Sequence, residues 1–174
     1  MRAFLALCLA AVAGCAQASG DAPEPPEPRA AEFRSRTVQQ AMDSAATLVR
    51  TRGFAGIGEE WRGFLVDHAS DVRELPMRSG TCYVLLGAGS SAMRELNLRV
   101  FDSDGAEIVQ DATNGPLAAL HFCPSQSGTY YVAVHASAGS GLFEVRTFRG
   151  PTGLEVRIDD IFREVAPAET GEVR

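Results

Sequence analysis

The sequence predicts a mainly β protein, an antiparallel β-sandwich with one helix packed on it near the N-terminus. Three observations lead to this prediction. From about Trp61 onward, short runs of alternating apolar and polar residues recur, separated by clusters of Gly, Ser, Asp and Asn, which is typical of a sandwich. Between Phe33 and Gly53, apolar residues instead recur at helical spacing. Hydrophobic residues make up 45% of the 174 residues, as in a folded globular chain.

The chain begins with MRAFLALCLAAVAGCAQ, in which one arginine precedes an apolar run and then small residues. This order is typical of a secretory signal. Val12 to Cys15, VAGC, resembles the lipobox of bacterial lipoproteins, in which the chain is cut before the cysteine and the cysteine carries lipid. The resemblance implies a signal peptide over residues 1–14, a membrane anchor on Cys15 and, because Ala16 is not Asp, export to the outer membrane. The alternative is ordinary cleavage after Ala18, in the small-residue stretch AQA.

Residues 15–32 are predicted to be the lipid anchor followed by an extended tether. Residues 16–32, AQASGDAPEPPEPRAAE, contain four prolines and three glutamates but no large apolar side chain. Such a composition cannot bury enough surface to order itself. At about 3.1 Å per residue, this polyproline-like segment reaches roughly 50 Å, so it would hold the domain away from the membrane.

Residues 33–60 are predicted to be the helical segment. Val38, Met42, Ala45 and Val49 share one helical face, which is expected to pack on the sheet. Gly53 is the expected C-cap.

Residues 61–165 are predicted to form the β-sandwich, and 166–174 a flexible tail. Leu96, Leu98 and Val100 point to one face of a strand, and Tyr130, Val132 and Val134 do so in another. Both rows are expected in the core. The expected strands are Val72–Met77, Cys82–Leu86, Leu96–Phe101, Glu107–Gln110, Leu117–Phe122, Tyr130–Ala136 and Phe143–Phe148.

Cysteine use predicts one disulfide. Signal cleavage removes Cys8 and lipid occupies Cys15, which leaves Cys82 and Cys123 to pair in an oxidising compartment. The loop that they close, of about 40 residues, would stabilise the fold by about 4 kcal/mol. The alternative is a metal site, since His121 and Cys123 lie two residues apart and would share one face of a strand.

Three pieces of the chain carry a family resemblance: GTCYVLLGAG, ELNLRVFDSDGAEIVQD and FCPSQSGTYYVAVHASAGSGLFEV. Together they resemble the bacterial pre-peptidase C-terminal domain, over roughly Val72 to Arg149. The resemblance implies a compact, jelly-roll-like β-sandwich, in a family that usually forms a non-catalytic appendage of secreted proteins.

Two places could bind a ligand. Asp102, Asp104 and Asp111 offer carboxylates for a weak calcium site, although the sequence SDG between apolar runs equally predicts a hairpin turn. Trp61, the one tryptophan, could either plug the end of the sandwich or offer a stacking surface to a glycan or peptide.

Nothing in the chain combines a nucleophile with a base at a recognised spacing. His135 to Gly139, HASAG, is only a partial match to a nucleophile elbow, which must join a strand to a helix. The net charge of −6, without any lysine, argues against a nucleic-acid partner. The sequence therefore predicts a non-catalytic envelope lipoprotein without a resident cofactor that binds another envelope protein or a glycan. The alternatives are an accessory subunit of a secreted hydrolase and a weak calcium-dependent binding module.

Overall fold

The computed structural model describes residues 28–111, 113–154, 156 and 161. The signal peptide 1–14, Cys15, most of the tether 15–32 and the tail 166–174 therefore lie outside the described residues. Within the described part, the one long helix lacks the apolar length that a membrane span requires.

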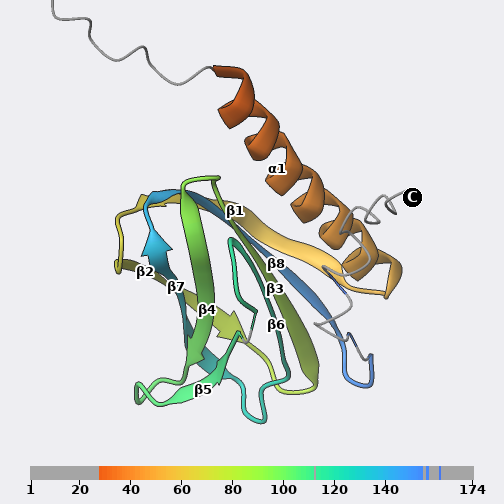
Figure 1. Cartoon of the computed structure of the whole chain (residues 1–174). Helices are drawn as coiled ribbons and strands as arrows, with labels where there is room; N and C mark the ends of the chain where they lie inside the picture. The colour runs from red at the N-terminus through yellow and green to blue at the C-terminus, as the bar shows by residue number, and fades with distance from the viewer. Residues whose placement is uncertain (1–27, 112, 155, 157–160, 162–174) are drawn as a thin grey trace, which may run out of the picture.

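The protein is a sandwich of two antiparallel four-stranded sheets with a helix on one outer face (Figure 1). Sheet A has the strand order β1-β8-β3-β6 and sheet B the order β2-β7-β4-β5. The predicted mainly β fold with one N-terminal helix is thus confirmed. The elements are α1 (Pro28–Thr51), β1 (Ala55–Leu65), β2 (Ser70–Met77), β3 (Thr81–Gly89), β4 (Met93–Phe101), β5 (Glu107–Gln110), β6 (Leu117–Phe122), β7 (Gly128–Gly139) and β8 (Gly141–Pro151).

The main core lies between the two sheets. Alternation along each strand turns every second side chain inward, and the two rows expected from the sequence are there. Leu96, Leu98 and Val100 of β4 are buried, as are Tyr130, Val132 and Val134 of β7. The register places Leu98 beside Val134 and Val100 beside Val132, so the two rows form a continuous apolar layer.

A second core lies between α1 and the outer face of sheet A. Met42, Ala45 and Val49 of the helix pack with Val84 and Leu86 of β3. Because β3 is covered on both faces, it reads as a nearly continuous apolar run. The predicted packing of the helix on the sheet is therefore confirmed.

The end of α1 is set by Gly53. Its φ of 93° lies in the left-handed region, which glycine adopts without steric cost. The N–H of Gly53 donates to the carbonyl of Arg50 and the N–H of Phe54 to that of Val49, which is the Schellman motif. Phe54 then packs into the second core with Val49.

The predicted boundaries of the helical segment were wrong at both ends. α1 begins at Pro28 and ends at Thr51, and β1 begins at Ala55, so the sandwich starts before Trp61. The sequence pattern did not predict β1 as a strand. β1 is an edge strand with an exposed first half, and its pairing with β8 shifts between Ile57 and Trp61. These features interrupt the period-two alternation that marks a strand.

Candidate functional site

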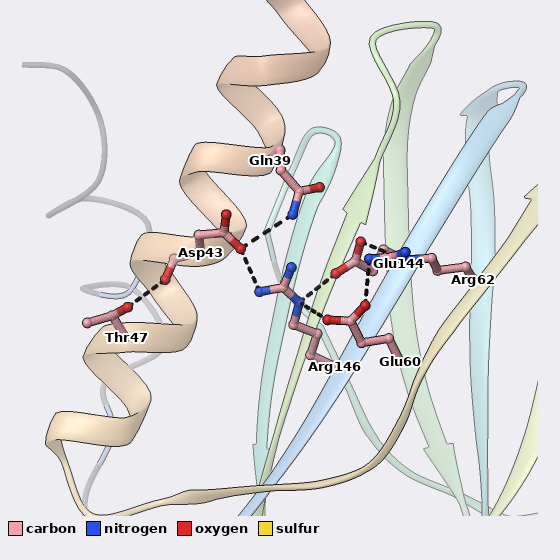
Figure 2. A network of polar contacts seen from close by, with 7 residues as sticks. All are labelled: Gln39, Asp43, Thr47, Glu60, Arg62, Glu144 and Arg146. Atoms are coloured by element: carbon pink, nitrogen blue, oxygen red, sulfur yellow. Dashed lines mark hydrogen bonds and ion pairs between the residues drawn. The ribbon is translucent and has the colours of Figure 1, made fainter.

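Charged side chains gather on the outer face of sheet A, the face on which α1 packs. On β1, Trp61 and Leu65 point into the sandwich, so Arg62 points outward. On β8, Phe143 and Val145 are the inward pair, so Glu144 and Arg146 point outward. The side chains of the resulting network, shown in Figure 2, are Gln39, Asp43, Thr47, Glu60, Arg62, Glu144 and Arg146.

Glu144 lies at the centre of this network. Its carboxylate accepts hydrogen bonds from Nε of Arg62, at 3.1 Å, and from Nε of Arg146. The side chains of Glu144 and Arg146 are both 12% exposed. Glu60 contacts the same two arginines. The charges of Glu144 and Arg146 are therefore compensated where water has little access.

Arg146 also connects the sheet to the helix. Its Nη1 lies 2.7 Å from Oδ1 of Asp43, and Gln39 donates to the same oxygen at 3.3 Å. Burial lowers the pKa of Arg146, but hydrogen bonds to Asp43 and Glu144 and their negative charges raise it, with a net rise above its ordinary value. The guanidinium therefore stays charged and holds α1 in place on the sheet.

A groove of about 530 Å³ lies between α1 and the ends of β1, β3 and β8. Val38 and Gln39 form its helical wall, and the strands supply the rest. Toward its N-terminus α1 extends past the end of the sheets (Figure 1). The strand residues that line the groove are Arg62, Gly63, Ala88, Gly89, Ser90, Leu142, Phe143 and Glu144.

Two large apolar side chains are exposed at the edge of this groove, where Leu142 lines it and Phe64 is the neighbour of Leu142 on β1. Leu142, which lines it, is 65% exposed, and Phe64 is 61% exposed. They are paired across β1 and β8, so they lie side by side on the same outer face. Val66, just after β1, is exposed as well. Exposed apolar side chains in one patch are typical of an interaction surface.

The groove offers recognition chemistry. Among the described residues that line it, Ser90 carries the one hydroxyl, and there is no histidine or cysteine. Its carboxylate, Glu144, is engaged by two arginines. Sequence reasoning did not find this site, although the period-two placement of Glu144 and Arg146 beside apolar residues could have identified an outward polar row.

Trp61 is a core residue. Its ring is 5% exposed and packs edge-on against Phe143, with ring centroids 5.6 Å apart. Its Nε1 donates to Oδ2 of Asp71 at 3.0 Å, and the guanidinium of Arg73 lies over the ring at 5.1 Å. Trp61 therefore lies in the core between the sheets, where it also lines a cavity of about 180 Å³ together with Arg73 and Leu75, and its use as a binding surface stays a prediction.

Of the three aspartates of the calcium hypothesis, Asp102 and Asp111 accept hydrogen bonds from backbone N–H groups. Oδ1 of Asp102 accepts the N–H groups of Asp104 and Ala106, both at 2.9 Å, within the β4–β5 hairpin. Asp111 is buried and accepts from Thr113 and from the N–H of Ala119. In the part of the chain that the structure describes, these three do not form a cluster of ligand atoms.

Cys82 and Cys123 form the predicted disulfide, which closes a separation of 41 residues. It lies where β3 pairs with β6, since Tyr83 is opposite Phe122. Nε2 of His121 lies 3.7 Å from Sγ of Cys123. Burial lowers the pKa of His121 below its ordinary value, and its ring packs edge to face with that of Phe54, with centroids 5.9 Å apart.

No known family model matches the chain, and no curated protein does either. Among solved structures, it is similar to the pre-peptidase C-terminal domain of a Bacillus anthracis collagenase, with 17% identity and a TM-score of 0.44 over 53% of this chain and 90% of that one. It is also similar to Aeromonas hydrophila PliG, a periplasmic inhibitor of g-type lysozyme, with 17% identity and a TM-score of 0.41 over 57% of this chain and 88% of that one. The first of these belongs to the family that the sequence resembles, and membership of that family stays a prediction.

Proposed function

We propose that this chain is a non-catalytic binding module of the cell envelope, which lipid on Cys15 holds at the membrane. In this proposal the groove beside α1 receives an apolar segment of a basic partner protein. The observation that carries it is the exposed pair of Phe64 and Leu142 at the groove, each more than 60% exposed.

The geometry supports recognition of a protein segment. The groove has apolar walls at Val38, Ala88 and Phe143 and charged groups at Arg62 and Glu144. Apolar anchors within a charged rim are the usual arrangement of a protein interface. The network of Figure 2 holds the two walls at a set separation, so the groove does not have to be organised by its partner.

The charge of the chain supports a basic partner. The whole chain carries a net charge of −6. The network at the groove combines Asp43, Glu60 and Glu144 with Arg62 and Arg146, which leaves one uncompensated negative charge. An acidic surface attracts a basic protein and speeds its association.

The compartment is supported by the lipobox and by the disulfide. VAGC at the end of an apolar leader implies export and lipidation of Cys15. A disulfide between Cys82 and Cys123 is typical of proteins outside the cytosol. An outer-membrane location rests on Ala16 after the lipidated cysteine.

The test is affinity capture from envelope extracts with four versions of the full chain: wild type, Phe64→Ser, Leu142→Ser and Val72→Ser. Val72 is also exposed, but on sheet B, so it is the matched control. A partner is a protein that the wild type and Val72→Ser retain and that both groove variants lose. It should be basic and should dissociate as salt is raised. Identical capture by all four chains would reject the groove.

A separate arm tests the anchor. Cys15→Ala should leave the membrane fraction and still bind the captured partner through the intact groove. If Cys15→Ala stays with membranes after carbonate washing, the lipid anchor is wrong, whatever the outcome at the groove.

A further inference from the structure

We propose that reduction of the Cys82–Cys123 disulfide creates a zinc site where the start of β3 meets the end of β6 in sheet A. The ligands would be the two thiolates and the imidazole of His121. The site is independent of the groove, because it lies at the β3–β6 pairing and faces Phe54.

The topology brings the three ligands to one face. Cys82 follows the first residue of β3, His121 lies in β6, and Cys123 comes directly after β6. The antiparallel register places Tyr83 opposite Phe122 and Val84 opposite His121, so side chains 82, 121 and 123 all point to the outer face of sheet A. Their ligand atoms lie within 4.8 Å of one another.

The spacing suits a tetrahedral metal once reduction lets the two bonded sulfur atoms of Cys82 and Cys123 move apart. Zinc binds sulfur at about 2.3 Å and imidazole nitrogen at about 2.0 Å, which places neighbouring ligand atoms roughly 3.5 to 3.8 Å apart. Nε2 of His121 is already 3.7 Å from Sγ of Cys123. Two thiolates and one imidazole match the preference of zinc for sulfur and nitrogen. They leave a fourth position for water.

The surroundings of the three ligands keep two of them in place and leave the third open to solvent. Cys82 is buried beside Phe54 in the second core, and the rings of Phe54 and His121 pack edge to face, so two of the three ligands are held by packing. Cys123 is exposed. A reductant and then a metal can therefore reach the site from the Cys123 side without opening the core.

The chemistry needs a thiol reductant. A dithiol attacks the exposed sulfur of Cys123, and Cys82 leaves as a thiolate. The second thiol of the reductant resolves the mixed disulfide, so the reductant ends as a disulfide and both cysteines gain one electron and one proton each. Zn²⁺ then displaces the two thiol protons and binds the thiolates together with neutral His121.

The test uses the full chain with Cys8→Ser and Cys15→Ser, so that Cys82 and Cys123 are the only cysteines. Zinc binding is measured by competition with a chromophoric chelator, with and without a phosphine reductant, and thiolate ligation by the charge-transfer absorption of bound Cd²⁺. The reduced chain should bind one zinc and release about two protons. The oxidised chain should show no thiolate–cadmium absorption.

His121→Ala, with His135→Ala on sheet B as the matched control, identifies the third ligand. His121→Ala should weaken zinc binding at least about tenfold, and His135→Ala should leave it unchanged. Circular dichroism is recorded in parallel, and if reduction unfolds the chain, zinc should refold it. A reduced chain that neither binds zinc nor refolds with it overturns the site, and equal binding by the two histidine variants overturns the role of His121.

Discussion

Asp43 of α1 and Arg146 of β8 form an ion pair, with Oδ1 and Nη1 2.7 Å apart, although 103 residues separate them in the sequence. The same guanidinium binds Glu144 and contacts Glu60. One side chain thus joins the helix to the outer face of sheet A, next to the groove that the helix lines (Figure 2).

Arg146→Met should loosen α1. The variant removes one of the two arginines that bind the nearly buried carboxylate of Glu144, so we expect a loss of about 1–3 kcal/mol in the free energy of unfolding. The loss should be at the lower end because Arg62 remains and Asp43 is exposed. Hydrogen exchange of α1 amides should accelerate as well. Arg52→Met, at an exposed position just after the helix, is the control. Equal effects of the two substitutions in urea denaturation would contradict the proposed role.

Trp61 and Phe64 lie on the same strand and point to opposite faces, so their truncations should differ sharply. Trp61→Ala removes a buried ring and should cost about 3–5 kcal/mol. Phe64→Ala removes an exposed ring and should change stability by no more than about 0.5 kcal/mol. Denaturation followed by circular dichroism measures both. A large loss for Phe64→Ala would show that this side chain is structural and would weaken the groove hypothesis.

Gly139 and Gly105 both have a positive φ, 87° and 82°, but their surroundings differ. A Cβ at Gly105 meets open space, whereas one at Gly139 runs into the backbone carbonyl of Ala92 and the N–H of Arg94. Gly105→Ala should cost roughly 1 kcal/mol for the backbone alone. Gly139→Ala should cost about 2 kcal/mol or more, because the β4 backbone must also move. Thermal denaturation ranks the two, and the reverse order would contradict the packing described here.

Removal of the disulfide tests its contribution to the fold. Cys82→Ala with Cys123→Ala should lower the free energy of unfolding by up to about 4 kcal/mol, because the unfolded chain regains the entropy of the loop. Urea denaturation gives the difference from the oxidised wild type. In an oxidised chain with Cys8→Ser and Cys15→Ser, a thiol reagent should label neither Cys82 nor Cys123 after unfolding. Two reactive thiols there would reject the bond.

Much of the sandwich could be predicted because local pattern and tertiary burial agree. The alternating rows at Leu96–Val100 and Tyr130–Val134 form the core layer between the sheets, and the turn signals fall between the strands. Gly53 ends the helix as its conformational freedom suggests. In these segments the period of the apolar residues matches the element that buries them.

The candidate groove could not be predicted in this way. Its walls come from α1 and from the ends of three strands that are far apart in the sequence, and its charged network depends on which strand neighbours which. β1 was missed because its first half is exposed and carries no apolar alternation. As a result, Phe64 was not recognised as an outward residue.

The sequence by itself determined the type of fold and the core rows, because these follow from periodicity and turn chemistry. It predicted the pairing of Cys82 with Cys123 from the expectation that Cys8 and Cys15 are unavailable, and the structure contains that disulfide. It also led to the prediction of export and of a lipid on Cys15. Only the tertiary structure determined which side chains from distant segments contact one another. It covered Trp61, used Asp102 and Asp111 for the backbone, and placed Arg146 beside Asp43. Such contacts depend on strand order and helix placement, which are long-range properties that no local sequence pattern contains.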